Sequence, residues 1–173
     1  MVRFVSLAAG AVLLFAGSAF AQGAKLTDPQ IAHIAYTAGV VDIDAAQQAL
    51  KKSNNPQVKA FAQDMVRDHT SVNDQALALC KKLGVTPEDN GTSRTMQKNG
   101  DAERAKLEGM SGAAFDREYA QNEVSYHHAV NSALENTLIP SANNPELKNL
   151  LSTGLKIFKG HEEHARAVVA SLK

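Results

Sequence analysis

The stretch NNPQVKAFAQDMVRDHTSV, residues 54–72, decides the fold of this chain. Asn55 precedes Pro56, and a side-chain cap before a proline is typical of the first turn of an α-helix. Apolar residues then recur at steps of three and four, which is the period of one helix face. His69 lies on this apolar face, where an aliphatic residue would be ordinary. The pattern predicts an amphipathic helix from Pro56 to about Leu83 with a histidine near its middle.

Three further segments show the same helical period. They run from Pro29 to about Lys52, from about Ser111 to Leu138, and from Pro145 to the C-terminus. Asp28 and Asn144 each precede a proline and are expected to cap their helices, while Pro140 is expected to end the third segment. Each apolar face again contains one ionisable residue; these are Asp42, His127 and His161. The sequence therefore predicts four long helices that direct polar side chains into a common core.

Residues 84–110 join the second helix to the third and are more polar than the helices that they connect. Within them, residues 93–107 predict a short exposed helix that is interrupted at Asn99-Gly100. Two helical hairpins joined by so long a connection describe an all-α, ferritin-like antiparallel four-helix bundle. We expect this bundle to form one domain over residues 22–173.

Residues 1–21 have the layout of a secretory signal peptide. A short start containing Arg3 precedes a mostly apolar run, which ends in the small-x-small sequence Ala19-Phe20-Ala21. The alternative is a membrane anchor, but the apolar run is short for one and is interrupted by glycine and serine. We therefore expect cleavage after Ala21, export of the mature chain to the periplasm, and no membrane span after cleavage.

Composition excludes several classes of ligand. Of the 18 basic residues only Arg3 precedes the cleavage site, so the mature domain has 17 basic against 18 acidic residues and lacks the positive charge of a nucleic-acid-binding protein. The sequence contains no Cys-x-x-Cys-His haem attachment motif and no glycine-rich phosphate-binding loop. Its single cysteine, Cys80, excludes an intrachain disulfide. Haem, nucleotide and nucleic acid are therefore not expected as ligands, and no protein partner is indicated.

The four polar residues on the apolar faces lie at similar depths in their helices. Asp42 and His69 each follow the first-turn proline of their helix by 13 residues, and His161 follows its proline by 16, about one turn more. His127 lies at a similar depth from Ser111. In an antiparallel bundle of helices of similar length, mid-helix positions share one layer. The spacing therefore predicts that the carboxylate and the three imidazoles face one another.

Three imidazoles and one carboxylate form a ligand set for zinc, and copper, nickel and iron accept the same donors. We expect a mononuclear transition-metal site in the middle of the bundle, with zinc as the first candidate. The alternative is a metal-free network, because core histidines also pair with carboxylates or tyrosine hydroxyls. The tyrosines available for such pairing are Tyr36, Tyr119 and Tyr126. In that case the chain would be a periplasmic bundle with a binding or scaffolding role.

The sequence argues against a di-iron centre of the ferritin type. Such centres take a Glu-x-x-His pair from each of two helices, and this sequence contains no such pair. Glu123 precedes His127 by four residues rather than three. It is expected either to orient that imidazole or to replace Asp42 as a ligand. No motif assigns an enzyme activity, and di-iron oxidase activity is disfavoured.

Several stretches resemble the bacterial family called "domain of unknown function 4142". They are FAQDMVRDHT at residues 61–70, LEGMSGAAFDREY at residues 107–119, and the later histidines His127 and His161. The resemblance covers nearly the whole mature chain and implies an exported, ferritin-like helical bundle. The family position that is usually Glu on the first helix corresponds to Asp42, whose side chain is one methylene shorter. Because the family is named for its lack of a known function, the resemblance implies a fold and no reaction.

Overall fold

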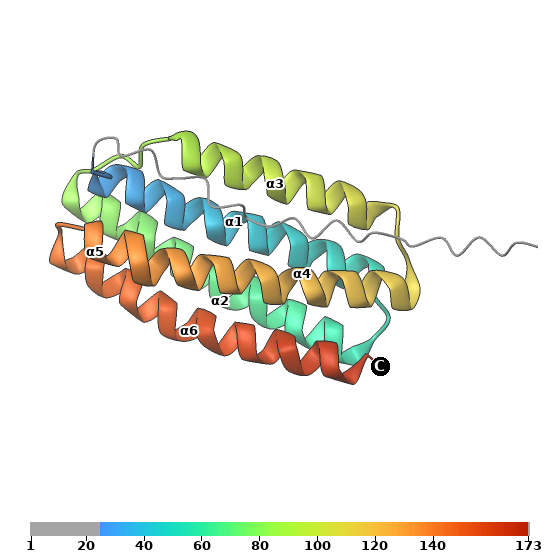
Figure 1. Cartoon of the computed structure of the whole chain (residues 1–173). Helices are drawn as coiled ribbons and strands as arrows, with labels where there is room; N and C mark the ends of the chain where they lie inside the picture. The colour runs from blue at the N-terminus through green and yellow to red at the C-terminus, as the bar shows by residue number, and fades with distance from the viewer. Residues whose placement is uncertain (1–24, 173) are drawn as a thin grey trace, which may run out of the picture.

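The computed structural model describes residues 25–172, which form an all-α bundle of four long helices (Figure 1). The predicted signal peptide, residues 1–21, lies outside the described residues. The helical elements in chain order are α1 (Asp28–Lys52), α2 (Pro56–Leu83), α3 (Gly91–Glu108), α4 (Gly112–Ala133), the π-helical turn η1 (Leu134–Leu138), α5 (Ile139–Ser141) and α6 (Pro145–Ser171). The long crossover between two hairpins gives the ferritin-like arrangement predicted from the sequence.

The four bundle helices are arranged so that neighbours run in opposite directions. Helices α1 and α2 form one hairpin, and α4 and α6 form the other (Figure 1). The square is closed by contacts of α1 with α4 and of α2 with α6, while α3 runs along the outside of α1. Residues halfway along the four helices therefore meet in one layer, as the sequence spacing requires.

Side-chain caps begin three of the four bundle helices, α1, α2 and α6. The side-chain oxygens of Asn55 and Asn144 accept hydrogen bonds from first-turn amides of α2 and α6, as predicted. The prediction for Asp28 is wrong, because Thr27 is the N-cap of α1. The Asp28 carboxylate instead accepts hydrogen bonds from the amides of Asn143 and Asn144 at 2.8 and 2.9 Å. Asp28 therefore joins the start of α1 to the start of α6.

The crossover contains an uninterrupted helix, so the predicted break at Asn99-Gly100 is wrong. Helix α3 continues through both residues to Glu108. A Cβ atom on Gly100 would lie 2.6 Å from Cγ1 of Val41, so the glycine allows α3 to approach α1 closely. Near the C-terminal end of α3, Leu107 is fully buried against the bundle. The glycine is a packing position rather than a helix break.

The third bundle helix also extends further than predicted. It passes through the π-helical turn η1 and continues through Pro140 to Ser141. In a regular α-helix the ring of Pro140 would clash with the carbonyl group of Asn136, four residues earlier. The wider turn immediately before Pro140 relieves this clash, so the proline does not end the helix.

Two apolar clusters fill the bundle, one toward each end. The first includes the aromatic residues Phe61, Phe115 and Tyr119. The second is mainly aliphatic and includes Ile31, Leu134 and Leu151. Buried polar residues separate the two clusters at mid-height. Across residues 25–172, no helix combines the length and apolar character needed to cross a membrane.

Candidate metal centre

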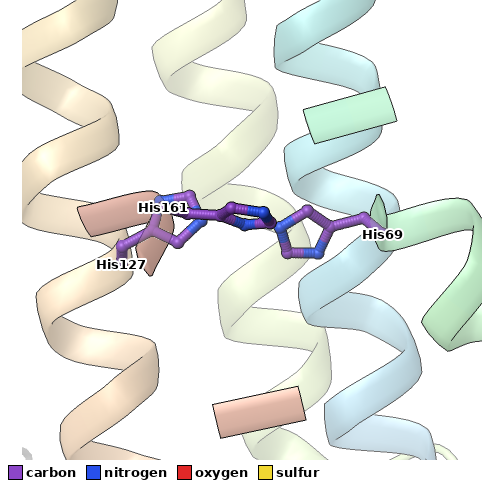
Figure 2. A group of neighbouring side chains, drawn as sticks. All are labelled: His69, His127 and His161. Carbon is purple, nitrogen blue, oxygen red and sulfur yellow. The ribbon is translucent and has the colours of Figure 1, made fainter. Parts of the chain in front are cut away.

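The four polar residues on the apolar faces lie in the layer midway along the bundle. Asp42 belongs to α1, His69 to α2, His127 to α4 and His161 to α6, and each residue is at most 6% exposed. The centroids of the three imidazole rings form a nearly equilateral triangle with sides of 5.3, 5.4 and 5.6 Å. Figure 2 shows these rings pointing toward one another. The helical period therefore placed all four residues in the correct layer.

Hydrogen bonds on the outer side of the cluster orient two of the rings. His127 Nδ1 donates to the carbonyl oxygen of Glu123 at 3.0 Å. His161 Nε2 lies 3.0 Å from Oδ2 of Asp68, whose carboxylate also accepts two hydrogen bonds from Arg67. A neutral imidazole carries one ring proton, so these bonds leave Nε2 of His127 and Nδ1 of His161 with lone pairs. Both nitrogens are buried without a hydrogen-bond partner.

Asp42 lies between two of the histidines. Its Oδ2 atom is 3.3 Å from Nε2 of His69 and 3.3 Å from Nε2 of His127. Neither carboxylate oxygen of Asp42 has a hydrogen-bond partner, and neither ring nitrogen of His69 has one. Since His127 carries its proton on Nδ1, the contact between Asp42 and His127 needs a proton or a cation between the two lone pairs.

Two overlapping groups of three residues each have ligand atoms close enough together to hold a metal ion. Ligand atoms of His69, His127 and His161 lie within 4.8 Å of one another, and those of Asp42, Glu123 and His127 do the same. Asp42 and His161 do not share a set. The four predicted residues therefore form a histidine triangle with a carboxylate at one side, and Glu123, only 1% exposed, adds a second carboxylate there.

Burial favours the uncharged forms of Asp42, His69, Glu123 and His127. Loss of water lowers the pKa of His69 to about 3 and the pKa of His127 to about 4. Burial also raises the pKa of Asp42 and raises the pKa of Glu123 well above its usual value. The contacts of Asp42 with His69 and His127 are therefore not ion pairs in the metal-free protein. A divalent cation would displace the protons that burial favours on the two carboxyl groups and would use neutral imidazoles as donors.

Asp68 contacts His161, and the sequence pattern did not indicate this contact. It lies off the apolar face of α2, and the helical period assigns such positions to solvent. Its hydrogen bonds from Arg67 lower the pKa of the Asp68 carboxyl, so the group that orients His161 is ionised. The contact joins residues 93 positions apart in the chain. No local sequence pattern could have indicated it.

The tyrosines considered as partners for the histidines have other contacts. The hydroxyl of Tyr126 donates to the carbonyl oxygen of Ala38 at 2.8 Å. The hydroxyl of Tyr119 is buried and has no hydrogen-bond partner in the described part of the chain. Tyr36 is only partly buried, and its carbonyl oxygen accepts a hydrogen bond from Asn73. These three side chains therefore do not satisfy the ring nitrogens of the cluster.

Comparison with known proteins agrees with the fold. The chain matches the family described as "Domain of unknown function (DUF4142)" over residues 15–168. It is also similar to a solved structure described as "Crystal structure of DUF305 fragment from Deinococcus radiodurans", with a TM-score of 0.72 and 16% sequence identity over 83% of this chain and 95% of that chain. At this identity the likeness concerns the fold alone. No curated protein matches the chain.

Proposed function

The chain belongs to the family described as "Domain of unknown function (DUF4142)". We propose from the sequence pattern of residues 1–21 that it is exported, and from the geometry of the polar layer that it binds one transition-metal ion. His69, His127 and His161 supply the nitrogen ligands, and Asp42 supplies a carboxylate. Glu123 is the alternative carboxylate, since it shares a possible ligand set with Asp42 and His127. Zinc is the first candidate ion because imidazole and carboxylate are among its preferred ligands.

The proposal depends on a group of buried polar atoms that lack hydrogen-bond partners. Within residues 25–172 this group includes both ring nitrogens of His69, Nε2 of His127, Nδ1 of His161 and both oxygens of Asp42. An unsatisfied buried polar group costs about 1 to 3 kcal/mol. A complete hydrogen-bond network would remove this cost, and a single metal ion would satisfy several donors at once. The number of unpaired polar atoms favours the metal.

The donor types narrow the choice of ion. Magnesium and calcium prefer shells of oxygen ligands, whereas a site dominated by imidazole suits zinc, copper, nickel or iron. With four protein ligands a zinc ion would be structural and would join all four bundle helices at mid-height. With three protein ligands the bound ion would supply Lewis-acid chemistry. The role that we propose is metal binding, with no assigned reaction.

Elemental analysis tests this proposal directly. Wild type, His69→Ala, His127→Ala and His128→Ala would be purified from the periplasm without chelator. His128 is the matched control, because it follows His127 in α4 but has a 72% exposed side chain that pairs with Glu162. We expect about one metal ion per chain in wild type and in His128→Ala, and none in the other two variants. Wild type that stays metal-free after incubation with zinc, copper, nickel and iron would overturn the proposal.

Thermal unfolding separates the metal site from the metal-free alternative. A ligand that binds only the folded state adds about 2.7 kcal/mol of stability when its free concentration is 100 times Kd. The unfolding midpoint of chelated wild type should therefore rise on addition of metal, and that of His69→Ala should not. If metal never moves the wild-type midpoint, a metal-free bundle with a binding or scaffolding role is the better account.

Export is part of the proposed function and has its own test. The sequence predicts cleavage after Ala21, so the mature protein should begin at Gln22. Intact-mass analysis of protein from the periplasmic fraction should give the mass of residues 22–173. Retention of residues 1–21 in a membrane fraction would contradict export as a free periplasmic protein.

A further inference from the structure

An apolar cavity of about 40 Å³ lies in the aliphatic half of the bundle, next to the histidine layer. Its walls come from α1, α2, α3, α4, η1 and α6, and include Ala38, Val72, Ala76, Leu138 and Leu151. None of the metal-ligand candidates lines it. The cavity is therefore a feature separate from the proposed metal site.

One aromatic ring separates the cavity from the histidines. Phe158 lines the cavity and stacks on His69, with ring centroids 4.5 Å apart and planes 7° apart. The same ring has its centroid 5.9 Å from that of His161 and 6.5 Å from that of His127. A molecule in the cavity would contact the ring that is packed against all three imidazoles.

Two local features of the sequence shape the space around this ring. Gly154 lies one helical turn before Phe158, and a Cβ atom at Gly154 would lie only 3.3 Å from Cε2 of the phenyl ring. On the opposite wall, Leu134 and Leu138 are the first and last residues of the π-helical turn, and both line the cavity. Wide turns of this kind often occur at functional sites. The lack of a side chain at Gly154 and the wide turn at Leu134–Leu138 therefore both shape the walls of this cavity.

The size and lining of the cavity determine what can occupy it. A volume of about 40 Å³ is roughly three times the minimum that one water molecule requires. Water also needs two to four polar partners, and the lining offers one polar side chain, Asn73. The Asn73 amide already donates to the carbonyl oxygen of Tyr36 at 3.3 Å. Apolar cavities of this kind stay dry and accept apolar molecules such as xenon.

We propose that this cavity binds a small apolar molecule of the size of a diatomic gas such as dioxygen, beside Phe158 and one ring away from His69. Binding requires the apolar walls and the free volume, and does not require a metal ion. The site therefore goes beyond the proposed metal-binding function, and each can be tested without the other.

Xenon is a suitable probe because it is apolar and of similar size to a diatomic gas. Chelated mature protein would be titrated with dissolved xenon and followed by the methyl resonances of leucine and valine. We expect one saturable site that shifts the methyl groups of Leu138 and Leu151. His69→Leu, which removes a proposed metal ligand but keeps a side chain of similar volume against Phe158, should keep the site. Wild-type protein that binds xenon at this site but stays metal-free would reject the metal proposal and leave this one standing.

Substitutions of residues that line the cavity test whether xenon occupies it. Ala76→Leu should fill it and weaken xenon binding at least tenfold, while Ala78→Leu, at an exposed position two residues later on α2, should not. Leu151→Ala should enlarge the cavity and strengthen binding, so the proposal stays testable if Ala76→Leu does not fold. Wild type without a saturable xenon site, or a site that responds to neither wall variant, would overturn the proposal.

Discussion

The polar layer and the two apolar clusters of the bundle differ in how burial affects their stability. In the apolar clusters, side chains such as Phe61 and Phe115 are fully buried, and removing them from water stabilises the fold. In the polar layer, Asp42 and His69 are buried as completely, but their polar atoms have lost water and gained no hydrogen bonds. Burial therefore favours folding in the clusters and costs free energy in the layer. The proposed metal ion would remove that cost.

The two apolar clusters also differ from each other. The aromatic cluster contains Phe61 and Tyr119 with ring centroids 6.1 Å apart in an edge-to-face arrangement. The aliphatic cluster borders the cavity beside Phe158. The histidine layer therefore has an aromatic cluster on one side and an apolar cavity on the other. A molecule in the proposed cavity site would lie on the aliphatic side of the layer.

The largest predicted effect is the difference in the free energy of unfolding that is lost when an apolar residue or a polar residue is replaced in chelated protein. Phe61→Ala should reduce the free energy of unfolding by about 3 to 5 kcal/mol, because it leaves a cavity in the aromatic cluster. His69→Leu should change it by less than about 1.5 kcal/mol, because no hydrogen bond is lost and the volume is similar. Urea unfolding of both variants measures the difference. Equal losses would show that the polar layer stabilises the metal-free fold as strongly as the apolar clusters do.

The second prediction concerns how the stability of chelated protein depends on pH. The pKa of His69 is lowered to about 3 and that of His127 to about 4. Between these values and the usual pKa near 6.5, the unfolded chain binds protons that the folded chain does not. The contribution of these two histidines to the free energy of unfolding is thus present in full above pH 6.5. It is lost as pH falls toward 4, by at most about 1.4 kcal/mol per pH unit for each histidine.

The buried carboxylates should give the opposite slope. The raised pKa values of Asp42 and Glu123 mean that the folded chain keeps protons that the unfolded chain releases. Their contribution is present below about pH 4 and is lost as pH rises through the raised values. In chelated protein, Asp42→Asn/Glu123→Gln should therefore lose stability from pH 6.5 to 4, whereas His69→Leu/His127→Leu should gain it. Urea unfolding across this range would show both slopes, and slopes of the same sign would contradict the assigned shifts.

The third prediction tests the residue outside the layer that orients a ligand. Asp68→Asn should raise the metal Kd about 10- to 100-fold, or about 1.4 to 2.8 kcal/mol, because the carboxylate no longer fixes the ring of His161. Asp64→Asn is the control, since Asp64 also pairs with Arg67, at 2.7 Å, but does not contact His161 through a hydrogen bond. Competition titration with a zinc chelator measures both affinities. Equal affinities for the two variants would show that Asp68 has only a surface role.

The layer was predictable because helical period is a local property of the sequence. Asp42 and His69 lie at steps of three and four from buried aliphatic residues, so the pattern alone indicates their direction and depth. Asp68 was not predictable, because its role arises from the distance between α2 and α6 and from a contact across 93 residues. Asp28 was misassigned for the same reason. Its carboxylate has a partner at the start of α6, and the local pattern suggested a cap for α1.

The same limit applies to the backbone features. Pro140 and Gly100 are local signals for the end or interruption of a helix, and both were overridden by tertiary structure. A wide turn before Pro140 and a close approach of α3 to α1 at Gly100 depend on neighbouring helices that the sequence pattern does not describe. Local patterns were therefore sufficient for the layer of the site and insufficient for the shape of its surroundings.

The smallest predicted effect tests whether α3 is part of the bundle's packing or only covers it. Alanine is favoured over glycine inside a helix by about 1 kcal/mol. Gly160→Ala in α6 should stabilise by about that amount, because a Cβ atom there would meet no other atom within 4 Å. Gly100→Ala should instead destabilise by about 1 kcal/mol, because its Cβ must displace the side chain of Val41, next to Asp42, and such overpacking costs about 1 to 3 kcal/mol. Urea unfolding of chelated protein measures both signs. If both variants are stabilised, α3 moves away from α1 at little cost, and the layer around Asp42 is independent of the crossover.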